Sequence, residues 1–219
     1  MTFTYKREKV EYTYRIDNIP TQEISSTKDL GVIVSNNLSW KEHIEKTTKK
    51  AYSILGCIIR HCDTIHDMDA ILLLYKSLVR SILEYGSIVW CPQTQVDRNR
   101  IENIQKKFVR YLFYKLNGFY PKYPNYIPYN SLIENVPIDS VQSRFSQNQI
   151  QFLKNIFSNQ IDSPYILSNI NIQVPKPRLR PNLSTFFTLP GSRNDHYLKS
   201  PIYYAMQQYN QLVPKPDLF

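Results

Sequence analysis

The feature of this sequence that most constrains its fold is the helical period of the apolar residues over residues 40–116. Apolar side chains recur every three or four positions in three successive stretches, and each stretch is long enough to bury one face of an amphipathic helix. Ser39 and Glu42 have the spacing of a capping box, and Asn117-Gly118 is a stop signal. We therefore predict a bundle of three helices. The first starts at Trp40, and the others cover about residues 68–85 and 96–116.

A short β segment is predicted ahead of this bundle. Residues 10–16 alternate between apolar and polar side chains, which is typical of a half-buried strand. Asp17 to Pro20 is expected to turn the chain, so that residues 21–25 pair back as a hairpin. Residues 30–34 are mostly apolar and predict a third, more buried strand.

A smaller helical module is predicted after the bundle. A connector rich in tyrosine and proline, residues 119–130, separates the two. We expect a helix over about residues 138–157, an extended stretch over 174–181, and a last helix over 202–212 that begins after Ser200-Pro201. The expected fold class is mainly α with a small N-terminal β segment, that is, α+β. The three expected units are residues 1–37, 38–118 and 119–219.

Charge and composition narrow the class of partner. The chain carries a formal charge of +9 and has a pI near 9.3, which favours a polyanion, nucleic acid first and an acidic membrane surface second. No apolar run approaches the roughly 20 residues that cross a bilayer, and the polar start from Met1 to Lys9 does not resemble a signal peptide. Three cysteines suit a reducing compartment. We expect an intracellular protein, nuclear or cytoplasmic, without a membrane partner.

The third predicted helix carries the best candidate site. On a helical wheel its apolar face lies opposite a basic and aromatic group. Such a stripe can contact successive phosphates and stack on a base or sugar. The alternative is an ordinary solvated helix face, although Glu102 offsets little of the positive charge. The candidate residues on this helix are Arg100, Lys106, Lys107, Arg110 and Tyr114.

Other clusters are weaker candidates. The lysines of the first helix are partly offset by Glu42 and Glu45, and a basic strip interleaved with prolines (Lys176, Arg178 and Arg180) is equally consistent with a surface linker. The Cys57/His61 and Cys62/His66 pairs have helical spacing for metal ligation, but the two pairs would point apart. We therefore favour a buried cysteine and a histidine at a helix end over a zinc site. His43, His196 and Ser192 do not form a recognisable catalytic triad.

Short signatures also occur in a fixed order along the chain. Together they resemble the C-terminal part of the reverse transcriptases of non-LTR retrotransposons, the jockey-like and LINE-like elements. They lie between Lys28 and Arg110, with weaker matches further along the chain, and are specific as a set. The signatures are Lys28 to Val32, Leu38-Ser39-Trp40 with His43-Ile44, Leu83 to Gly86 with Val89-Trp90, and Ile101-Glu102 with Gln105 to Arg110.

The resemblance implies a role for each part. The Tyr14 to Asn18 hairpin would end the palm, and the segment around Gly31 would correspond to the primer grip, where a glycine lets backbone approach the primer closely. The helices after Trp40 would be the thumb, which lies along a template–primer duplex. Weaker matches, including Arg144, fall in the tail. The implied nucleic-acid contacts are thus Gly31, Arg144 and the candidate residues of the third helix.

The resemblance also implies what this sequence lacks. A polymerase needs clustered carboxylates that hold two metal ions, and no Tyr-x-Asp-Asp sequence occurs here. We therefore expect a fragment of an RNA-directed DNA polymerase that is inactive alone and has no cofactor, the divalent metal belonging to the missing palm. Its expected partners are an RNA or DNA template–primer duplex and the palm and fingers of the same polyprotein. The alternative function is a helical protein-interaction module; an independent hydrolase has little support.

Overall fold

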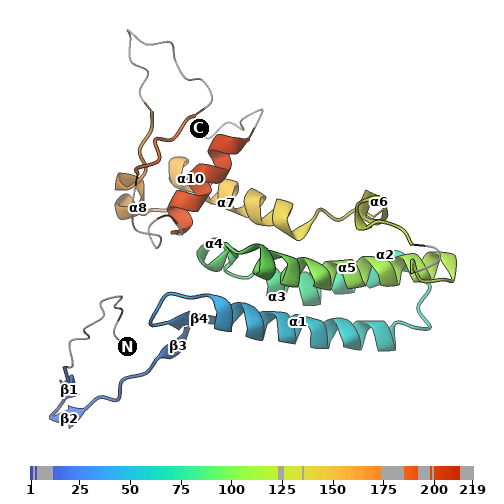
Figure 1. Ribbon diagram of the computed structural model, residues 1–219, viewed down its shortest axis with the longest axis horizontal. Helices are drawn as coiled ribbons and strands as arrows, with labels where there is room; N and C mark the ends of the chain where they lie inside the picture. The colour runs from blue at the N-terminus through green and yellow to red at the C-terminus, as the bar shows by residue number, and fades with distance from the viewer. Residues whose placement is uncertain are drawn as a thin grey trace, which may run out of the picture.

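The structure, a computed structural model, is mainly helical with small antiparallel two-stranded sheets near the N-terminus, which confirms the predicted fold class (Figure 1). It describes residues 1, 3, 12–122, 126–134, 136–173, 185–191, 198 and 200–212. The strands are β1 (Arg15–Ile16), β2 (Ile19–Pro20), β3 (Ser26–Asp29) and β4 (Val32–Ser35). The helices are α1 (Lys41–His61), α2 (Met68–Leu74), the π-helix η1 (Tyr75–Arg80), α3 (Ser81–Glu84), α4 (Ser87–Trp90), α5 (Gln95–Asn117), α6 (Tyr129–Glu134), α7 (Val141–Phe157), α8 (Pro164–Ser168) and α10 (Pro201–Gln211).

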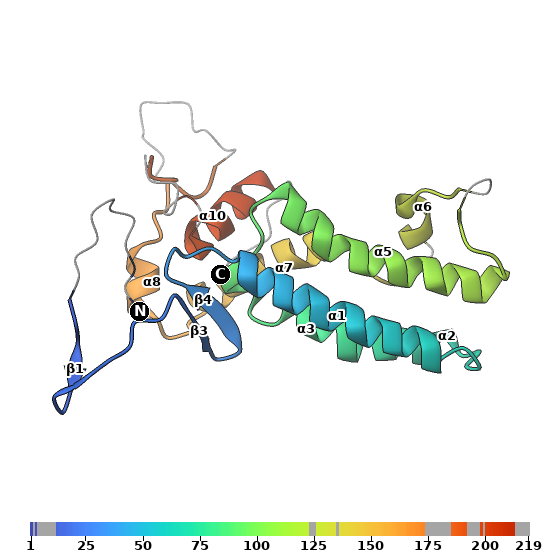
Figure 2. The ribbon, with the colours of Figure 1, turned by 60° about the horizontal axis from the view of Figure 1, so that its bottom comes forward.

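The N-terminal strands form two separate hairpins, and not the predicted three-strand segment. In the first, β1 pairs with β2 across a turn at Asp17 and Asn18, both of which have positive φ. This hairpin projects from the molecule as an arm (Figures 1 and 2). In the second, β3 pairs with β4, and Leu30-Gly31 forms the turn between them. The expected strand over residues 30–34 was therefore wrong at its start, because both turn residues have positive φ. Residues 10 and 11 of the first expected strand lie outside the described residues.

The middle of the chain forms the predicted helical bundle. Helices α1 and α5 lie side by side and run in the same direction, with the α2–η1–α3 segment packed against α1 (Figures 1 and 2). Two hydrogen bonds join their C-terminal ends: the Tyr111 hydroxyl donates to the carbonyl of Cys62 at 3.2 Å, and the Lys115 ammonium donates to the carbonyl of Asp63 at 2.5 Å. The buried side chains of this core include Ile44, Leu55, Ile71, Tyr75, Val79, Leu83, Trp90, Ile104 and Phe108.

Most predicted helix ends are confirmed, because a single local residue determines each. The Asp67 carboxylate caps α2, Ser200 caps α10, and Gly118 ends α5 with a φ of 78°. The predicted capping box at the start of α1 does not form. Its two members have other partners: Ser39 Oγ accepts from the Lys41 N–H at 3.4 Å, and the Glu42 carboxylate accepts from Lys46 at 2.8 Å.

The second predicted helix contains an unexpected π-helical segment. From η1 into α3 the buried positions follow a spacing of four, at Tyr75, Val79 and Leu83. A wider turn of this kind rotates the positions between them towards solvent. Leu78 lies three positions after the buried Tyr75, where a regular α-helical period would return to the core, and it is 45% exposed.

The C-terminal part builds a second, smaller core. α7 bridges the two cores, because Phe145 belongs to the first and Leu153 to the second. α10 packs beside α7 (Figure 1). Helices α4, α6 and α8 were not predicted from the sequence; each has only four to six residues, which is too short for a helical period to be visible. The predicted extended stretch over 174–181 lies outside the described residues.

Among the described residues, no helix combines the length and the apolarity needed to cross a membrane.

Candidate nucleic-acid interface

Helix α5 presents three of the predicted contact residues on one side. Thr94 Oγ1 accepts a hydrogen bond from the Asp97 N–H and starts the helix. The buried side of α5 faces the bundle core, with Ile104 and Phe108 fully buried. Because Arg100, Lys107 and Arg110 are three and seven residues apart, they lie on the opposite side as neighbours.

The side of α5 that carries Arg100 and Lys107 borders α1, which adds charges of its own. The Lys107 ammonium lies 5.7 Å from the centre of the Tyr52 ring on α1. The Glu45 carboxylate of α1 pairs with Lys49 at 2.9 Å. The pKa of Glu45 is lowered by this hydrogen bond, and further by the charges of Arg100 and Lys41, so these groups are gathered around one carboxylate. We call Lys41, Lys49, Arg100, Lys107 and Arg110, together with Glu45, the basic face.

Lys106 lies one turn before Arg110 on α5, but its ammonium turns away from the other cations of this face. Its ammonium lies 5.3 Å from the centre of the Tyr129 ring on α6, on the other flank of α5. Glu102 lies on that flank too, where its carboxylate accepts from the Tyr129 hydroxyl at 2.6 Å and from the Val141 N–H at 3.0 Å. Glu102 therefore ties α5 to α6 and α7 and does not offset the charge of the basic face.

Tyr114 marks the far end of the basic face. Its ring stacks on Tyr120, with centroids 4.3 Å apart and planes 7° apart, and the Lys122 ammonium lies 5.4 Å from the Tyr120 ring centre. The predicted aromatic contact residue is therefore packed against another tyrosine, next to a further cation.

Arg144 is placed inside the molecule. Its residue is 4% exposed, and its guanidinium forms an ion pair with Glu84 and donates to the carbonyl of Asp139 and, at 3.0 Å, to the Gln105 side chain. All these partners are internal. In this structure Arg144 holds α7 against α3 and α5, and it is not available to nucleic acid.

In the structure Gly31 lies next to Tyr85, which belongs to the Leu83 to Gly86 signature. A Cβ added to Gly31 would lie 3.1 Å from Cε1 of Tyr85, and the Tyr85 hydroxyl donates to the carbonyl of Leu30 at 2.8 Å. The φ of Gly31 is 86°. A turn conformation and the adjoining Tyr85 ring therefore suffice to explain this glycine, without a primer strand.

The sequence did not reveal a second basic surface between the β3–β4 hairpin and α1. A cavity of about 360 Å³ opens there, and Lys28, Lys46 and Lys50 line it. His43 forms its buried wall: Nδ1 accepts from the Ile33 N–H at 3.2 Å, and burial lowers the pKa of the imidazole. The only sequence signal was that Lys28 and His43 both fall within the quoted signatures.

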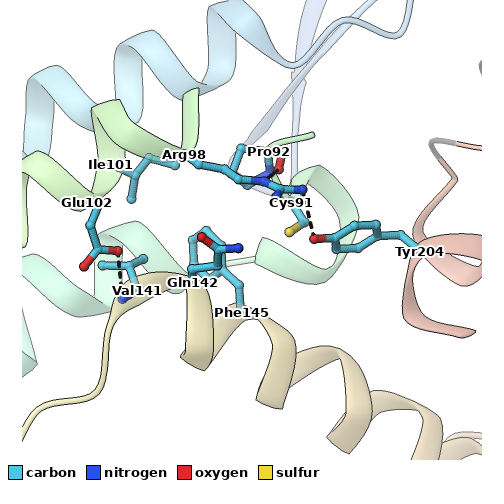
Figure 3. Close-up of a pocket in the computed structure, with 9 residues that line it drawn as sticks. All are labelled: Cys91, Pro92, Arg98, Ile101, Glu102, Val141, Gln142, Phe145 and Tyr204. Atoms are coloured by element: carbon cyan, nitrogen blue, oxygen red, sulfur yellow. Dashed lines mark hydrogen bonds between the residues drawn. The ribbon is translucent and has the colours of Figure 1, made fainter. Parts of the chain in front are cut away.

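The joint between the bundle and the C-terminal module is closely packed. Figure 3 shows Arg98 donating to the carbonyl of Pro92 at 3.0 Å and to the Tyr204 hydroxyl at 3.1 Å, with Cys91 beside them. The cavity between these groups is only about 10 Å³, barely the space of one water molecule. Burial raises the pKa of the Cys91 thiol to about 12, so it stays protonated at neutral pH. These features describe a structural contact and not a ligand site.

The cysteine and histidine pairs do not converge. Cys57 Sγ lies 3.4 Å from His61 Nδ1 on the exposed side of α1, whereas Cys62 is buried. Within the part of the chain that the structure describes, no three potential metal ligands come together. Ser192, His196, Lys176, Arg178 and Arg180 lie outside that part.

Comparison of the chain with models of protein families, with curated proteins and with solved structures gave no match.

Proposed function

We propose that this chain binds a nucleic-acid duplex through the basic face, as the thumb and tail of a reverse transcriptase of the non-LTR retrotransposon type. The observation that carries the proposal is a gathering of cations from two parallel helices: Lys41, Lys49, Arg100 and Lys107. Arg110 follows Lys107 by one turn of α5, and the described carboxylates near these cations are those of Glu45 and of Asp97, one turn before Arg100. The order of the sequence signatures supports the polymerase part of the proposal. The chain would contribute binding, and the missing palm would contribute the metal-dependent chemistry.

The size of the face suits a short stretch of backbone. Arg100 and Arg110 are ten residues apart on α5, which corresponds to about 15 Å along the helix axis. Phosphates of one strand follow each other at about 3.4 Å along a B-form duplex. The face would therefore span about four phosphates, and shape or backbone contacts, with no base-specific readout, would supply the affinity.

Charge reversal on α5 tests this proposal. The triple variant Arg100→Glu, Lys107→Glu and Arg110→Glu should lose duplex binding, measured by fluorescence anisotropy with a labelled RNA–DNA hybrid. With fewer substitutions, the slope of log affinity against log salt should fall by roughly 0.9 for each phosphate contact removed. All three side chains lie on the surface side of α5, so circular dichroism and the melting temperature should stay close to those of the parent.

A matched control carries the same change of charge elsewhere. Arg15, Lys76 and Lys154 lie on β1, η1 and α7, away from the basic face. Reversing these three should weaken duplex binding only slightly, through the change in net charge. Equal losses of affinity in both triple variants would mean that binding follows net charge alone. Unchanged affinity in the α5 variant would refute the proposed interface.

The projecting arm, the β1–β2 hairpin, suggests that the chain also binds a protein. An isolated two-stranded hairpin is marginally stable in water, and exposed apolar patches mark interaction sites. The arm exposes apolar side chains all along its length: Tyr12 at 70%, Tyr14 at 64%, Ile16 at 68% and Ile19 at 69%. We propose that the missing palm of the same polyprotein covers this arm. Absence of salt-dependent duplex binding by the unsubstituted chain would instead favour a protein-interaction module.

A further inference from the structure

An apolar groove opens at the end of the bundle where α1 and α5 begin. Its volume is about 460 Å³, within the range of pockets that hold small ligands. The apolar part of its lining is made by Leu38, Trp40, Ile44, Val89, Pro92 and Pro201. Leu38 and Val89 are 41% and 46% exposed. In the part of the chain that the structure describes, no segment therefore covers the mouth of the groove.

The groove is continuous with the basic face. Lys41 lines the groove and also belongs to the basic face, where its charge acts on Glu45. On the α5 side, Asp97 lines the groove, and Arg100 of the basic face follows one helical turn later. A phosphate held by Lys41 and Arg100 would therefore place the base of its own nucleotide at the mouth of the groove.

The chemistry of the lining suits a nucleobase. A base presents an apolar face that stacks on aromatic side chains and a polar edge that forms hydrogen bonds. The groove offers the Trp40 indole for the face. For the edge it offers the carboxamide oxygen of Gln93, whose Nε2 donates to the Cys91 carbonyl at 3.3 Å. An apolar peptide side chain would satisfy the indole but would bring no negative charge to Lys41.

We propose that this groove takes one unpaired nucleobase from the strand whose phosphates lie on the basic face. Bases inside a duplex are stacked and paired and cannot enter such a groove, so the preferred ligand is a duplex that ends in a single-stranded nucleotide. This inference rests on the proposed function, because the basic face must hold the strand.

Three duplexes test the inference: a blunt one, one with a single overhanging nucleotide, and one whose overhang is abasic. Stacking of one base corresponds to a roughly 5- to 150-fold gain in affinity, so the base-bearing overhang should bind tighter by that factor and the abasic one should not. The sequence has two tryptophans, and Trp90 is fully buried. Quenching of tryptophan fluorescence by the base-bearing overhang alone would therefore report stacking on Trp40.

Two glutamate variants supply the control. Val89→Glu places a carboxylate in the groove, whereas Leu78→Glu makes the same change of charge on η1, at a residue exposed to the same extent, 45% against 46%. We expect Val89→Glu to abolish the gain from the overhanging base, and Leu78→Glu to keep it. A gain that survives in Val89→Glu would overturn the inference.

The outcomes separate the inference from the proposed function. If no duplex binds with salt-dependent affinity, the basic face fails as an interface, and the inference fails with it. If the blunt duplex binds and the overhanging base adds nothing, the basic face stands and the base site is refuted. The groove would then be assigned to an apolar segment of a protein.

Discussion

Removing either partner of the buried ion pair between Arg144 and Glu84 should destabilise the protein, and the two losses should differ. Breaking a buried pair by deleting one charge costs about 3–5 kcal/mol, because the other charge stays behind. In Arg144→Met, Glu84 keeps a second cation, since Arg80 Nε lies 2.9 Å from its carboxylate. The Gln105 side-chain oxygen likewise keeps the Tyr75 hydroxyl at 3.2 Å. We therefore expect a loss near the lower limit, about 3 kcal/mol.

Glu84→Gln should destabilise the protein more than Arg144→Met does. The guanidinium of Arg144 stays 4% exposed, and its partners among the described residues are then all neutral: the backbone carbonyl of Asp139, the side-chain oxygen of Gln105 and the amide oxygen introduced at position 84. The loss should approach the upper limit, about 5 kcal/mol. For a chain of this length, such losses lower the melting temperature by about 6–12 °C for Arg144→Met and about 10–20 °C for Glu84→Gln.

Urea unfolding followed by circular dichroism measures both losses, and Lys154→Met on the same helix is the matched control. Lys154 is less buried than Arg144, so its replacement should change the free energy of unfolding by less than about 0.5 kcal/mol. The reasoning is refuted if Arg144→Met costs less than about 1 kcal/mol, below the buried-pair range. If this variant stays folded but loses duplex affinity, Arg144 would be assigned to the nucleic-acid interface.

Two further predictions concern the β3–β4 hairpin. Burial lowers the pKa of His43 below its ordinary 6.5, so the unfolded state takes up the proton first and stability should fall as pH drops below about 6.5, by at most about 1.4 kcal/mol per pH unit. In urea unfolding between pH 8 and pH 5, His43→Asn keeps an acceptor without a titrating group and should flatten this fall; an unchanged slope would speak against His43. Gly31→Ala and Gly118→Ala should both cost about 1–2 kcal/mol, because both glycines have positive φ. Gly31→Ala should cost more, since its Cβ would meet the Tyr85 ring at 3.1 Å whereas no described atom lies within 4 Å at Gly118; equal losses would show that the ring moves aside freely.

The sequence predicted those parts of the fold that depend on neighbouring residues. The ends of α2, α5 and α10 follow from one capping residue each, and the apolar period gave the bundle helices. The hairpin turn at Leu30-Gly31 was missed because its anchors are remote. The Ile33 N–H bonds to His43, ten residues away, and the Leu30 carbonyl bonds to Tyr85, 55 residues away.

The candidate site was predictable only on one helix. The helical wheel correctly placed Arg100 and Lys107 on the side of α5 away from its buried residues, but the contribution of α1 required knowing that the two helices run side by side. Arg144 shows the opposite limit. A basic residue beside an apolar one in an amphipathic helix suggests an exposed charge, and the carboxylate that pairs with it is 60 positions earlier in the chain. That the basic face binds a duplex stays a prediction.

The π-helical segment η1 has a consequence for how this chain tolerates insertions and deletions. Its wider turns let the helix between Asp67 and Tyr85 contain more residues than an α-helix joining the same two packed ends would need. Deleting one exposed residue of η1, such as Ser77, would therefore remove the excess and leave a regular helix with Tyr75 and Leu83 still facing the core. α5 is a regular α-helix without such an extra residue. Deleting one residue there would rotate every later side chain by about 100°, away from its partner.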